Sequence, residues 1–518
     1  MTRFVQLALG LSVLCLTCAG QAERQTTGAQ EPSAGAPAPV DFQVYTEPPR
    51  LLLAGRRLRL LHRERERKSM RWEQFSALIE GGARMSEPGF AHALYGVVAD
   101  SKSSCGQALT WALKTADAKQ AGDLRQVALI YDWCKPQLDA ASTSSLEKLL
   151  LTTLTLRPRN ALEVRSAVFA AIAVADANPA VAGNFLHYAF EDWWRKQTLP
   201  LLRAGEDPFP RRASLMALLE IVHVLRDNLR VDLREDAPKW FGELPMRLML
   251  AYYPAPWPAA ENEYRIPAYS GSGDPDLNES VYSRVAEMAL VAADPNAQPT
   301  QFLQGWLMQD RFLMRSPLGA PYEFLWANPY LPGLSFDYMP DLYHAQGRLF
   351  VRSSWDDNAV WFGLWDREMQ LYRDGQRFAI TAEAGHASID LGPVRVFFGG
   401  PATRFETGWW KKPDEDSKAV EQVAFVVGLQ PSTTYDVEVD GEEMDDAETD
   451  RAGILELHFP PDHKAGVRLH KAQPGIRQST RVPDVSSGPV SGWAAKRAEP
   501  AGNRSESPNF PDRDCLGL

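Results

Sequence analysis

The sequence predicts a helical domain of the α/α toroid type, followed by an antiparallel β-sandwich. Between residues 50 and 310, apolar side chains recur at helical spacing in segment after segment, joined by short loops that contain proline or glycine. After residue 315 the segments become short and rich in aromatic and β-branched residues, with turn residues between them. The chain has 518 residues, of which 45% are apolar, so it is long enough to form two or three domains.

The charge balance of the chain disfavours nucleic acid as a partner. It contains 66 acidic and 55 basic residues, which gives a formal net charge of −11 at pH 7. A uniformly acidic chain repels phosphates. Beyond the N-terminus, no apolar stretch reaches the roughly 18 residues that cross a bilayer. The sequence therefore predicts no nucleic-acid partner and no membrane span after the N-terminal segment.

The N-terminus is typical of an export signal. Arg3 precedes a mostly apolar stretch, and small residues stand at Gly20 and Ala22. We expect residues 1–22 to be removed as a signal peptide, which places the mature protein in the periplasm or outside the cell. Lipidation at Cys18 is the less favoured alternative, because the preceding residues lack the usual small and aliphatic positions. Residues 23–40 read as a flexible leader.

The helical toroid-like domain is expected over residues 41–315, with a plain helical bundle as the alternative. Segment 161–176 is small and apolar nearly all round, so it should be an inner helix. Cys105 and Cys134 fall on neighbouring predicted helices, and both a disulfide and a pair of buried thiols remain open for them. The expected helices cover residues 58–70, 87–99, 104–117, 123–137, 144–156, 161–176, 184–198, 212–229, 235–252 and 277–293.

The antiparallel sandwich is expected over residues 316–470, and residues 471–518 read as a disordered tail. Prolines and aromatic residues between 310 and 345 predict the interface between the two domains. The stretch 436–450 holds nine acidic residues and indicates an exposed acidic strand, with a weak calcium site as the alternative. No zinc-ligand pattern occurs, so no metal or cofactor is predicted. The expected strands cover residues 349–353, 359–364, 369–372, 377–380, 394–398, 422–427, 434–439 and 454–459.

Three motifs resemble those of the heparinase II/III-like polysaccharide lyases and their alginate-lyase relatives. They lie at residues 49–53 (PRLLL), at 123–133 and at 352–363, and the resemblance spans roughly residues 48–400. It implies a toroid followed by a β-sandwich, and cleavage of acidic, uronate-containing glycans by β-elimination. The chain departs from the family pattern on one strand, where 366–371 (DREMQL) replaces a two-histidine motif and His386 is the nearest histidine.

β-Elimination needs a group that neutralises the uronate carboxylate, a base that removes the C5 proton and an acid for the leaving oxygen. Tyr264 and Tyr269 are candidate bases, Arg265 is a candidate carboxylate clamp, and His386 is a candidate acid or base. The helical domain of the family commonly carries an Asn-His or Asn-Asn pair at the cleft, whereas here Asn160 stands alone before the inner helix, and a helix N-cap is the competing explanation. Trp257 and Trp326 are candidate sugar-stacking residues, with core packing as the alternative.

Two other functions remain open. A non-catalytic glycan-binding or envelope protein would fit the missing two-histidine motif. A toroid glycoside hydrolase would use carboxylates among Asp274, Asp276 and Glu279, for which capping of the following helix is the competing explanation.

Overall fold

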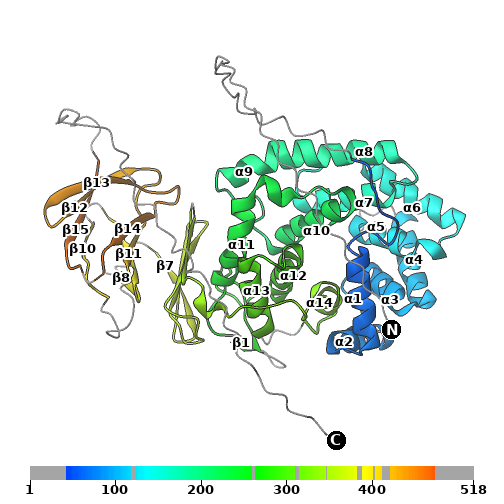
Figure 1. The fold of residues 1–518 in the computed structure, drawn as a ribbon, viewed down its shortest axis with the longest axis horizontal. Helices are drawn as coiled ribbons and strands as arrows, with labels where there is room; N and C mark the ends of the chain where they lie inside the picture. The colour runs from blue at the N-terminus through cyan, green and yellow to red at the C-terminus, as the bar shows by residue number, and fades with distance from the viewer. Residues whose placement is uncertain are drawn as a thin grey trace, which may run out of the picture.

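The computed structural model describes residues 42–117, 123–258, 263–309, 314–345, 347–381, 388–400, 403–410, 420–461 and 463–472. A helical half leads into a β region of three mostly antiparallel sheets (Figure 1). None of the helices in these ranges combines the length and apolar character needed to cross a bilayer. The expected signal peptide and leader, and the tail beyond residue 472, lie outside the described residues.

The helical half extends to residue 338, beyond the expected boundary at 315. Its helices are α1 Gly55–Glu66, α2 Met70–Glu80, α3 Pro88–Ala99, α4 Lys102–Asp117, α5 Leu124–Trp133, η1 Lys135–Gln137, α6 Ala140–Thr153, α7 Ala161–Ala173, α8 Pro179–His187, the π-helix η2 Tyr188–Thr198, α9 Leu199–Arg203, α10 Arg212–Leu229, η3 Leu233–Asp236, α11 Pro238–Leu250, α12 Leu277–Ala293, α13 Gln298–Gln309, α14 Gly319–Trp326 and η4 Phe336–Tyr338.

The inner helices pack in chain order. Contacts join α3 to α5, α5 to α7, α7 to α10, α10 to α12 and α12 to α14. Helix α14 then packs against α2, and the ring of Tyr322 lies 4.9 Å from the ring of Phe90 in α3. Helix α7 is buried on nearly every side, which confirms the inner helix predicted at 161–176.

Side-chain caps explain where several helices begin. The Asn160 carboxamide oxygen accepts a hydrogen bond from the backbone N–H of Glu163 at 3.0 Å, and this confirms the cap interpretation for that residue. Helix α6 starts four residues earlier than expected, because Asp139 provides its cap. The single helix expected at 58–70 is two helices, since the chain turns at Lys68, whose φ is +51°.

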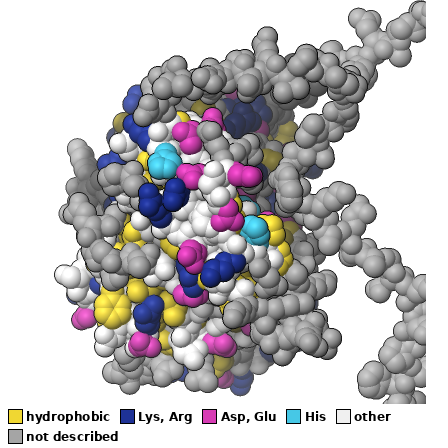
Figure 2. All heavy atoms as spheres, turned by 90° about the vertical axis from the view of Figure 1, so that its left-hand side faces the viewer, with side chains coloured by type: hydrophobic (Ala, Val, Ile, Leu, Met, Phe, Trp, Pro, Cys, Tyr) yellow, Lys and Arg dark blue, Asp and Glu magenta, His cyan; other side chains and the backbone are white. Residues whose placement is uncertain are grey.

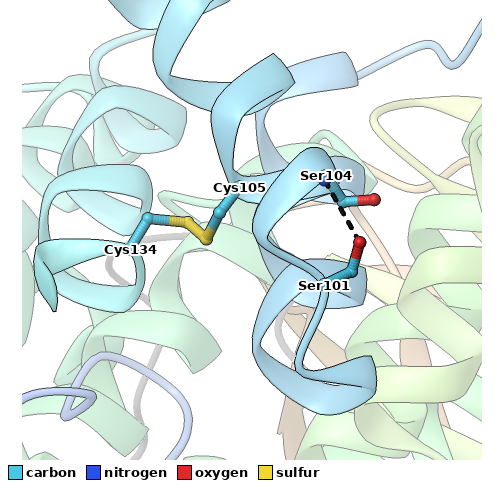
Figure 3. Close-up of a disulfide and its surroundings, with 4 residues drawn as sticks. All are labelled: Ser101, Ser104, Cys105 and Cys134. Carbon is cyan, nitrogen blue, oxygen red and sulfur yellow. Dashed lines mark hydrogen bonds between the residues drawn. A yellow bond between two sulfur atoms is a disulfide. The ribbon is translucent and has the colours of Figure 1, made fainter. Parts of the chain in front are cut away.

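A disulfide joins the outer helix α4 to the end of α5. Cys105 and Cys134 have Cα atoms 5.8 Å apart and are both buried (Figure 3). In the same view, the Ser101 hydroxyl accepts a hydrogen bond from the N–H of Ser104 at 3.3 Å, at the start of α4. The structure thus decides for the disulfide over the pair of free thiols.

Two motif segments from the sequence analysis lie against each other. The Asp132 carboxylate in α5 accepts hydrogen bonds from the backbone N–H groups of Arg50 and Leu51, at 2.8 and 2.9 Å. The Trp133 indole donates to the Leu51 carbonyl at 2.8 Å. The Arg50 Nε also lies 3.4 Å from the Asp132 carboxylate, and both side chains are fully buried. These contacts therefore hold the segment before α1 against the end of α5.

The β region has three sheets, and a short hairpin (β1, β2) belongs to the helical half. The first sheet has the order β3-β4-β5-β6-β7, the second β14-β11-β9-β8 and the third β10-β15-β12-β13. The strands are β1 Trp257–Pro258, β2 Glu263–Tyr264, β3 Leu342–Ala345, β4 Arg348–Arg352, β5 Trp361–Trp365, β6 Glu368–Arg373, β7 Gln376–Ile380, β8 Ser388–Leu391, β9 Val394–Phe398, β10 Thr403–Glu406, β11 Gln422–Val427, β12 Thr434–Val439, β13 Glu442–Glu448, β14 Leu455–Phe459 and β15 Gly466–Lys471.

The second sheet lies between the other two, so the β region has three layers. Phe425 of β11 belongs to the core shared with the first sheet, and Val426 to the core shared with the third. All six residues of β11 are buried. Strands β9 and β11 pair in parallel, whereas the other named strand pairs within the described residues are antiparallel. The expected strands are present, but the purely antiparallel arrangement expected for them is wrong at this pair.

The first sheet shares its core with the helical half. Trp361 in β5 is fully buried and its indole donates to the Leu250 carbonyl at 2.8 Å. The hydroxyl of Tyr253 donates to the Gln370 side-chain oxygen in β6 at 2.6 Å. The tyrosine ring also lies 5.2 Å from Trp361. On the helical side, the interface with the first sheet is therefore formed by the end of α11 and the segment after it.

The aromatic residues expected at the interface lie elsewhere for the most part. Tyr322, Phe324 and Trp326 are in α14 and pack inside the helical half. Phe336 does reach toward the β region, because its ring lies 5.3 Å from that of Trp355.

Candidate functional site: a groove and a helical cavity

A groove of about 420 Å³ runs between the helical half and the first sheet. The first turns of α10 and α12 form one side, and the loop of residues 267–276 lies beside them. Phe350 of β4 and the end of β5 form the other side. The groove therefore exists only because the two halves of the molecule meet.

Four arginines line the groove, three from the helical half and Arg348 from β4. Arg247 and Arg348 lie 3.5 and 3.2 Å from the Asp207 carboxylate. Arg211 and Arg212, at the start of α10, also line the groove and form no ion pair within the described part of the chain. Burial lowers the pKa of Arg247, with Asp207 opposing the shift. Arg211 and Arg212 are therefore the guanidinium groups of the groove that remain available to pair with an anionic group of a ligand.

Tyr269 is the residue predicted from the sequence as a base that lines this groove. Its hydroxyl donates to the Gly273 carbonyl at 3.0 Å. Its own carbonyl accepts hydrogen bonds from Gln370 and Arg377, each at 3.0 Å. The Arg377 guanidinium lies 4.1 Å from the centre of the tyrosine ring. The first sheet therefore fixes the position of Tyr269.

The end of β5 brings an aromatic side chain and a strained turn to the groove. Trp365 is half-buried, with its ring 6.0 Å from Phe350. Asp366 and Arg367 follow in the left-handed region, with φ of 48° and 68°. Neither residue is glycine, so each costs roughly 1–2 kcal/mol in this conformation. This turn opens the stretch where the family's two-histidine motif was expected.

The carboxylates considered for a hydrolase lie along the same groove. Asp274, Asp276 and Glu279 all line it. Asp276 accepts a hydrogen bond from the N–H of Asn278 at 2.9 Å and so caps α12, as the competing explanation predicted. With Asp207 and Asp366, these acids give the groove both signs of charge.

Two predicted binding residues are engaged in protein contacts. Arg265 donates to the Pro254 carbonyl at 3.0 Å and forms an ion pair with Asp357 at 2.5 Å. Trp326 is 2% exposed and has the Arg57 guanidinium 4.0 Å from its ring centre. Neither residue lines the groove.

The remaining predicted residues are not brought to the groove by the described structure. Trp257 is half-buried in β1 and packs against the helical core. Asn160 is an exposed cap. The backbone of Tyr264 lies in β2, but its side chain is outside the described residues, and so is the whole of His386.

A second cavity, of about 780 Å³, lies inside the helical half and was not predicted from the sequence. Residues near the starts of α5, α7, α10, α12 and α14 line it. Among them are Glu87, Arg165, Tyr282 and Tyr322. The sequence signal was present, because Arg165 interrupts the apolar pattern of the inner helix, but only packing shows that it is buried.

A buried charge network forms one side of this cavity. Arg125 holds Glu220 through two hydrogen bonds of 3.0 and 2.6 Å, and reaches Glu87 at 3.2 Å. Glu87 also accepts from the Tyr322 hydroxyl at 2.7 Å, and Arg165 donates to Glu220 at 3.1 Å. Desolvation raises the pKa of Glu87, with Arg125 opposing the shift. The network thus places hydrogen-bond donors and a carboxyl group along one side of the cavity.

The outer β surface has a more balanced charge than the sequence suggested. On the β end of the molecule, Figure 2 shows acidic, basic and histidine side chains interspersed. In the third sheet, Glu438 lies 3.4 Å from Arg468 and 3.7 Å from His470. Strand β13 of the acidic stretch is the edge strand of that sheet. The described residues contain no cluster of three or more histidine, cysteine or acidic side chains placed to hold a metal ion.

Comparison of the sequence with protein-family models finds no match, and comparison with curated proteins finds none either. The function is therefore inferred from the groove, the cavity and the sequence motifs.

Proposed function

We propose that this chain is an exported heparinase II/III-like protein that binds an acidic polysaccharide in the groove and cleaves it by β-elimination. One observation carries the proposal: four arginines, Tyr269 and a half-buried tryptophan, Trp365, line one groove. Guanidinium groups pair with uronate carboxylates, and an indole face stacks on a sugar ring. Chains of uronic acids are the polymers that present both features at every repeat.

The proposed scaffold is an α/α toroid. The support is the unbroken series of contacts from α3 through α5, α7, α10 and α12 to α14. The contact between Tyr322 and Phe90 then brings the last inner helix back beside the first. Substrate clefts of such helical rings lie at one end of the inner helices, and the groove lies at the first turns of α10 and α12.

In the proposed reaction, Arg211 and Arg212 neutralise the uronate carboxylate and so acidify the proton on C5. Tyr269 is the base that takes up that proton on its phenolic oxygen. The electron pair forms the double bond between C4 and C5 while the bond from C4 to the glycosidic oxygen breaks. His386, in a segment outside the described residues, remains the proposed acid for the leaving oxygen. The products are an unsaturated uronide and a new chain end.

Export is part of the same proposal. The N-terminal segment has the pattern of a signal peptide, and the disulfide between Cys105 and Cys134 is of the kind that persists in oxidising compartments. Both features are consistent with action on a polysaccharide outside the cytoplasm.

A non-catalytic glycan-binding protein is the second candidate. The turn at Asp366 and Arg367 stands where the two-histidine motif was expected, and no histidine is among the described residues that line the groove. Such a protein would keep the arginines and Trp365 for binding and would release no product.

The test is product analysis after incubation of the folded, exported protein with a panel of uronate polymers. The lyase proposal expects ultraviolet absorbance from unsaturated uronides. New reducing ends without that absorbance would identify a hydrolase instead. Retention of a polymer without any product would identify the binding protein, and neither retention nor product would overturn both candidates.

A double variant tests whether the arginines of the groove bind the polymer. Replacing Arg211 and Arg212 together by glutamine should weaken polymer binding by about tenfold or more, because two carboxylate partners are lost. Arg203→Gln, on the exposed end of α9, is the matched control and should leave binding unchanged.

A further inference from the structure

We propose that the outer face of α1, together with the loop of residues 327–335 beside it, is a docking surface for a lipid bilayer that carries anionic headgroups. The surface combines a row of exposed arginines with exposed apolar side chains at one end of that row. It lies away from the three sheets (Figure 1), and none of its residues lines the groove. The proposal is therefore independent of cleavage in the groove.

The arginines follow one face of α1 at helical spacing. Residues that are three or four positions apart lie on the same side of a helix, one turn after another. Along α1 and its C-cap, this spacing aligns four exposed arginines over roughly 16 Å, at a rise of about 1.5 Å per residue. These four residues, the arginine row, are Arg56, Arg59, Arg63 and Arg67.

Most of the positive charge on this face has no carboxylate partner. The first three members of the arginine row, and the exposed Lys68 that follows it, form no ion pair with another described residue. The acids of α1 offset little of this charge, because Glu64 is buried and pairs with Arg71 at 2.6 Å, which leaves Glu66 at the edge of the row. A chain with a net charge of −11 therefore has a basic surface here, and such a surface attracts anionic headgroups.

Exposed apolar side chains adjoin the C-terminal end of the arginine row. The hydroxyl of Tyr330, whose side chain is half-exposed, accepts a hydrogen bond from Arg67 at 3.1 Å. Met70 and Met308 line one pocket together with Leu331, the residue after Tyr330. The two methionines are 57% and 59% exposed. These flexible apolar groups lie beside the arginines, where they can enter the acyl region below the headgroups.

The combination of charge and apolar surface favours a bilayer over a soluble acidic polymer. A polysaccharide offers carboxylates to the arginine row, but it leaves both methionines in water. A bilayer offers partners to both, because lipid phosphates pair with guanidinium groups and acyl chains cover the methionines.

The test is sedimentation of the exported protein with lipid vesicles at low ionic strength. We expect binding to vesicles made of equal parts of phosphatidylglycerol and phosphatidylcholine. Binding to vesicles of phosphatidylcholine alone should be at least about tenfold weaker. Added salt should weaken the binding to the anionic vesicles, because it screens exposed charges.

A triple variant tests the arginine row. Arg56→Gln, Arg59→Gln and Arg63→Gln in one chain should weaken binding to the anionic vesicles by about tenfold or more. The substitutions break no ion pair among the described residues, so folding should be retained. The matched control changes the net charge by the same amount and should bind like the natural protein. It replaces by glutamine three exposed cations from separate parts of the surface, Lys114, Lys148 and Arg404.

A double variant tests the apolar part of the surface. Met70→Gln with Met308→Gln keeps the net charge and should weaken vesicle binding several-fold. The proposal is overturned if the natural protein does not sediment with anionic vesicles or binds both kinds of vesicle equally. It is also overturned if the arginine variant binds like its control, or the methionine variant like the natural protein. Binding of a soluble polyuronate through the arginine row, without vesicle binding, would identify a polymer site instead and would overturn it too.

Discussion

Asp132 shows how a single carboxylate can hold a sequence motif in place. It is buried and accepts hydrogen bonds from the backbone of Arg50 and Leu51 while facing the Arg50 side chain. The Arg50 guanidinium also pairs with Asp176 at the surface. Desolvation raises the pKa of Asp132, with the two backbone N–H groups and Arg50 opposing the shift. Removal of this carboxylate would leave two buried backbone donors without their acceptor, whereas Arg50 would keep its pair with Asp176.

We therefore expect Asp132→Ala to lower the free energy of unfolding by about 2–5 kcal/mol, because two buried backbone N–H groups each lose a charged acceptor. Urea denaturation measures this directly. Asp192→Ala is the control, because its ion pair with Lys196 is exposed and screened by solvent, so its loss should have a much smaller effect. Equal effects of the two substitutions would contradict the scaffold role of Asp132.

His344 links the first and second sheets through charge. Its imidazole lies 2.6 Å from Glu456 and 3.4 Å from Asp450. Burial alone would lower the pKa of His344, but hydrogen bonds to Asp450 and Glu456 outweigh it and raise the pKa to about 9. The histidine is therefore charged at neutral pH in the folded protein.

A raised pKa gives this histidine a definite pH dependence. Its stabilising contribution is fully present below the unfolded value near 6.5 and is lost as the pH rises through about 9. Urea denaturation across this window should show the free energy of unfolding of the natural protein falling relative to that of His344→Gln. A constant difference between the two proteins from neutral pH to beyond pH 9 would contradict the assignment.

At the residue scale, the sequence identified Tyr269 but not Arg165, Glu87 or Tyr282. Tyr269 lies in a polar aromatic loop, which is a recognisable pattern. A charged residue within an apolar helix has the same appearance whether it faces solvent or a buried partner. The Arg165 partner, Glu220, is 55 positions away in the chain, so the pair is visible only after folding.

At the scale of elements, the positions of the strands could be predicted from the sequence, whereas the stacking of the strands into three sheets could not. Strand β11 reads QVAFVV, and its uninterrupted apolar run is typical of a strand buried on both faces. The same run is also compatible with one buried face and a few exposed apolar side chains, so it does not by itself fix the number of sheets. The parallel pairing of β9 with β11 depends on the crossover between them, which contributes β10 to the third sheet before the chain returns to the second.

The disulfide between α4 and α5 is the element-scale feature with the clearest energetic consequence. Cys105 and Cys134 are 29 positions apart, and closing a loop of that length in the unfolded chain should stabilise the fold by about 3–4 kcal/mol. Replacing both cysteines by alanine should lower the urea midpoint accordingly. Adding a reductant to the natural protein should reproduce the loss, and adding it to the double variant should change nothing. Stability that is insensitive to both changes would contradict this role.

At the scale of the whole molecule, the groove arises from the joint between the helical half and the first sheet. Phe350, Trp361 and Tyr372 of the sheet belong to the same core as the helices. No single segment of the sequence contains the groove, because its walls come from residues more than 150 positions apart. The sequence therefore predicted the two halves and four candidate residues of the groove, Tyr269, Asp274, Asp276 and Glu279, whereas the arginines of the groove were found only in the assembled structure.

Gln370 makes side-chain hydrogen bonds across the interface between the first sheet and the helical half. Its side chain accepts from the Tyr253 hydroxyl and donates to the Tyr269 carbonyl. Gln370→Ala should lower the free energy of unfolding by about 1–3 kcal/mol, because buried partners lose their hydrogen bonds. It should also reduce turnover by displacing Tyr269. Full stability combined with unchanged turnover would show that the joint does not position the groove.

The central claim is that Tyr269 acts as the base in a groove that binds acidic polysaccharide. The most direct measurement is the initial rate of unsaturated uronide formation by the natural protein and by Tyr269→Phe, on a polymer that both proteins bind. Tyr269→Phe loses only a hydroxyl bonded to the Gly273 carbonyl, so folding and polymer affinity should be retained. The account predicts that the rate falls by about a hundredfold or more. An unchanged rate in Tyr269→Phe, or no unsaturated product from the natural protein on any uronate polymer, would contradict it.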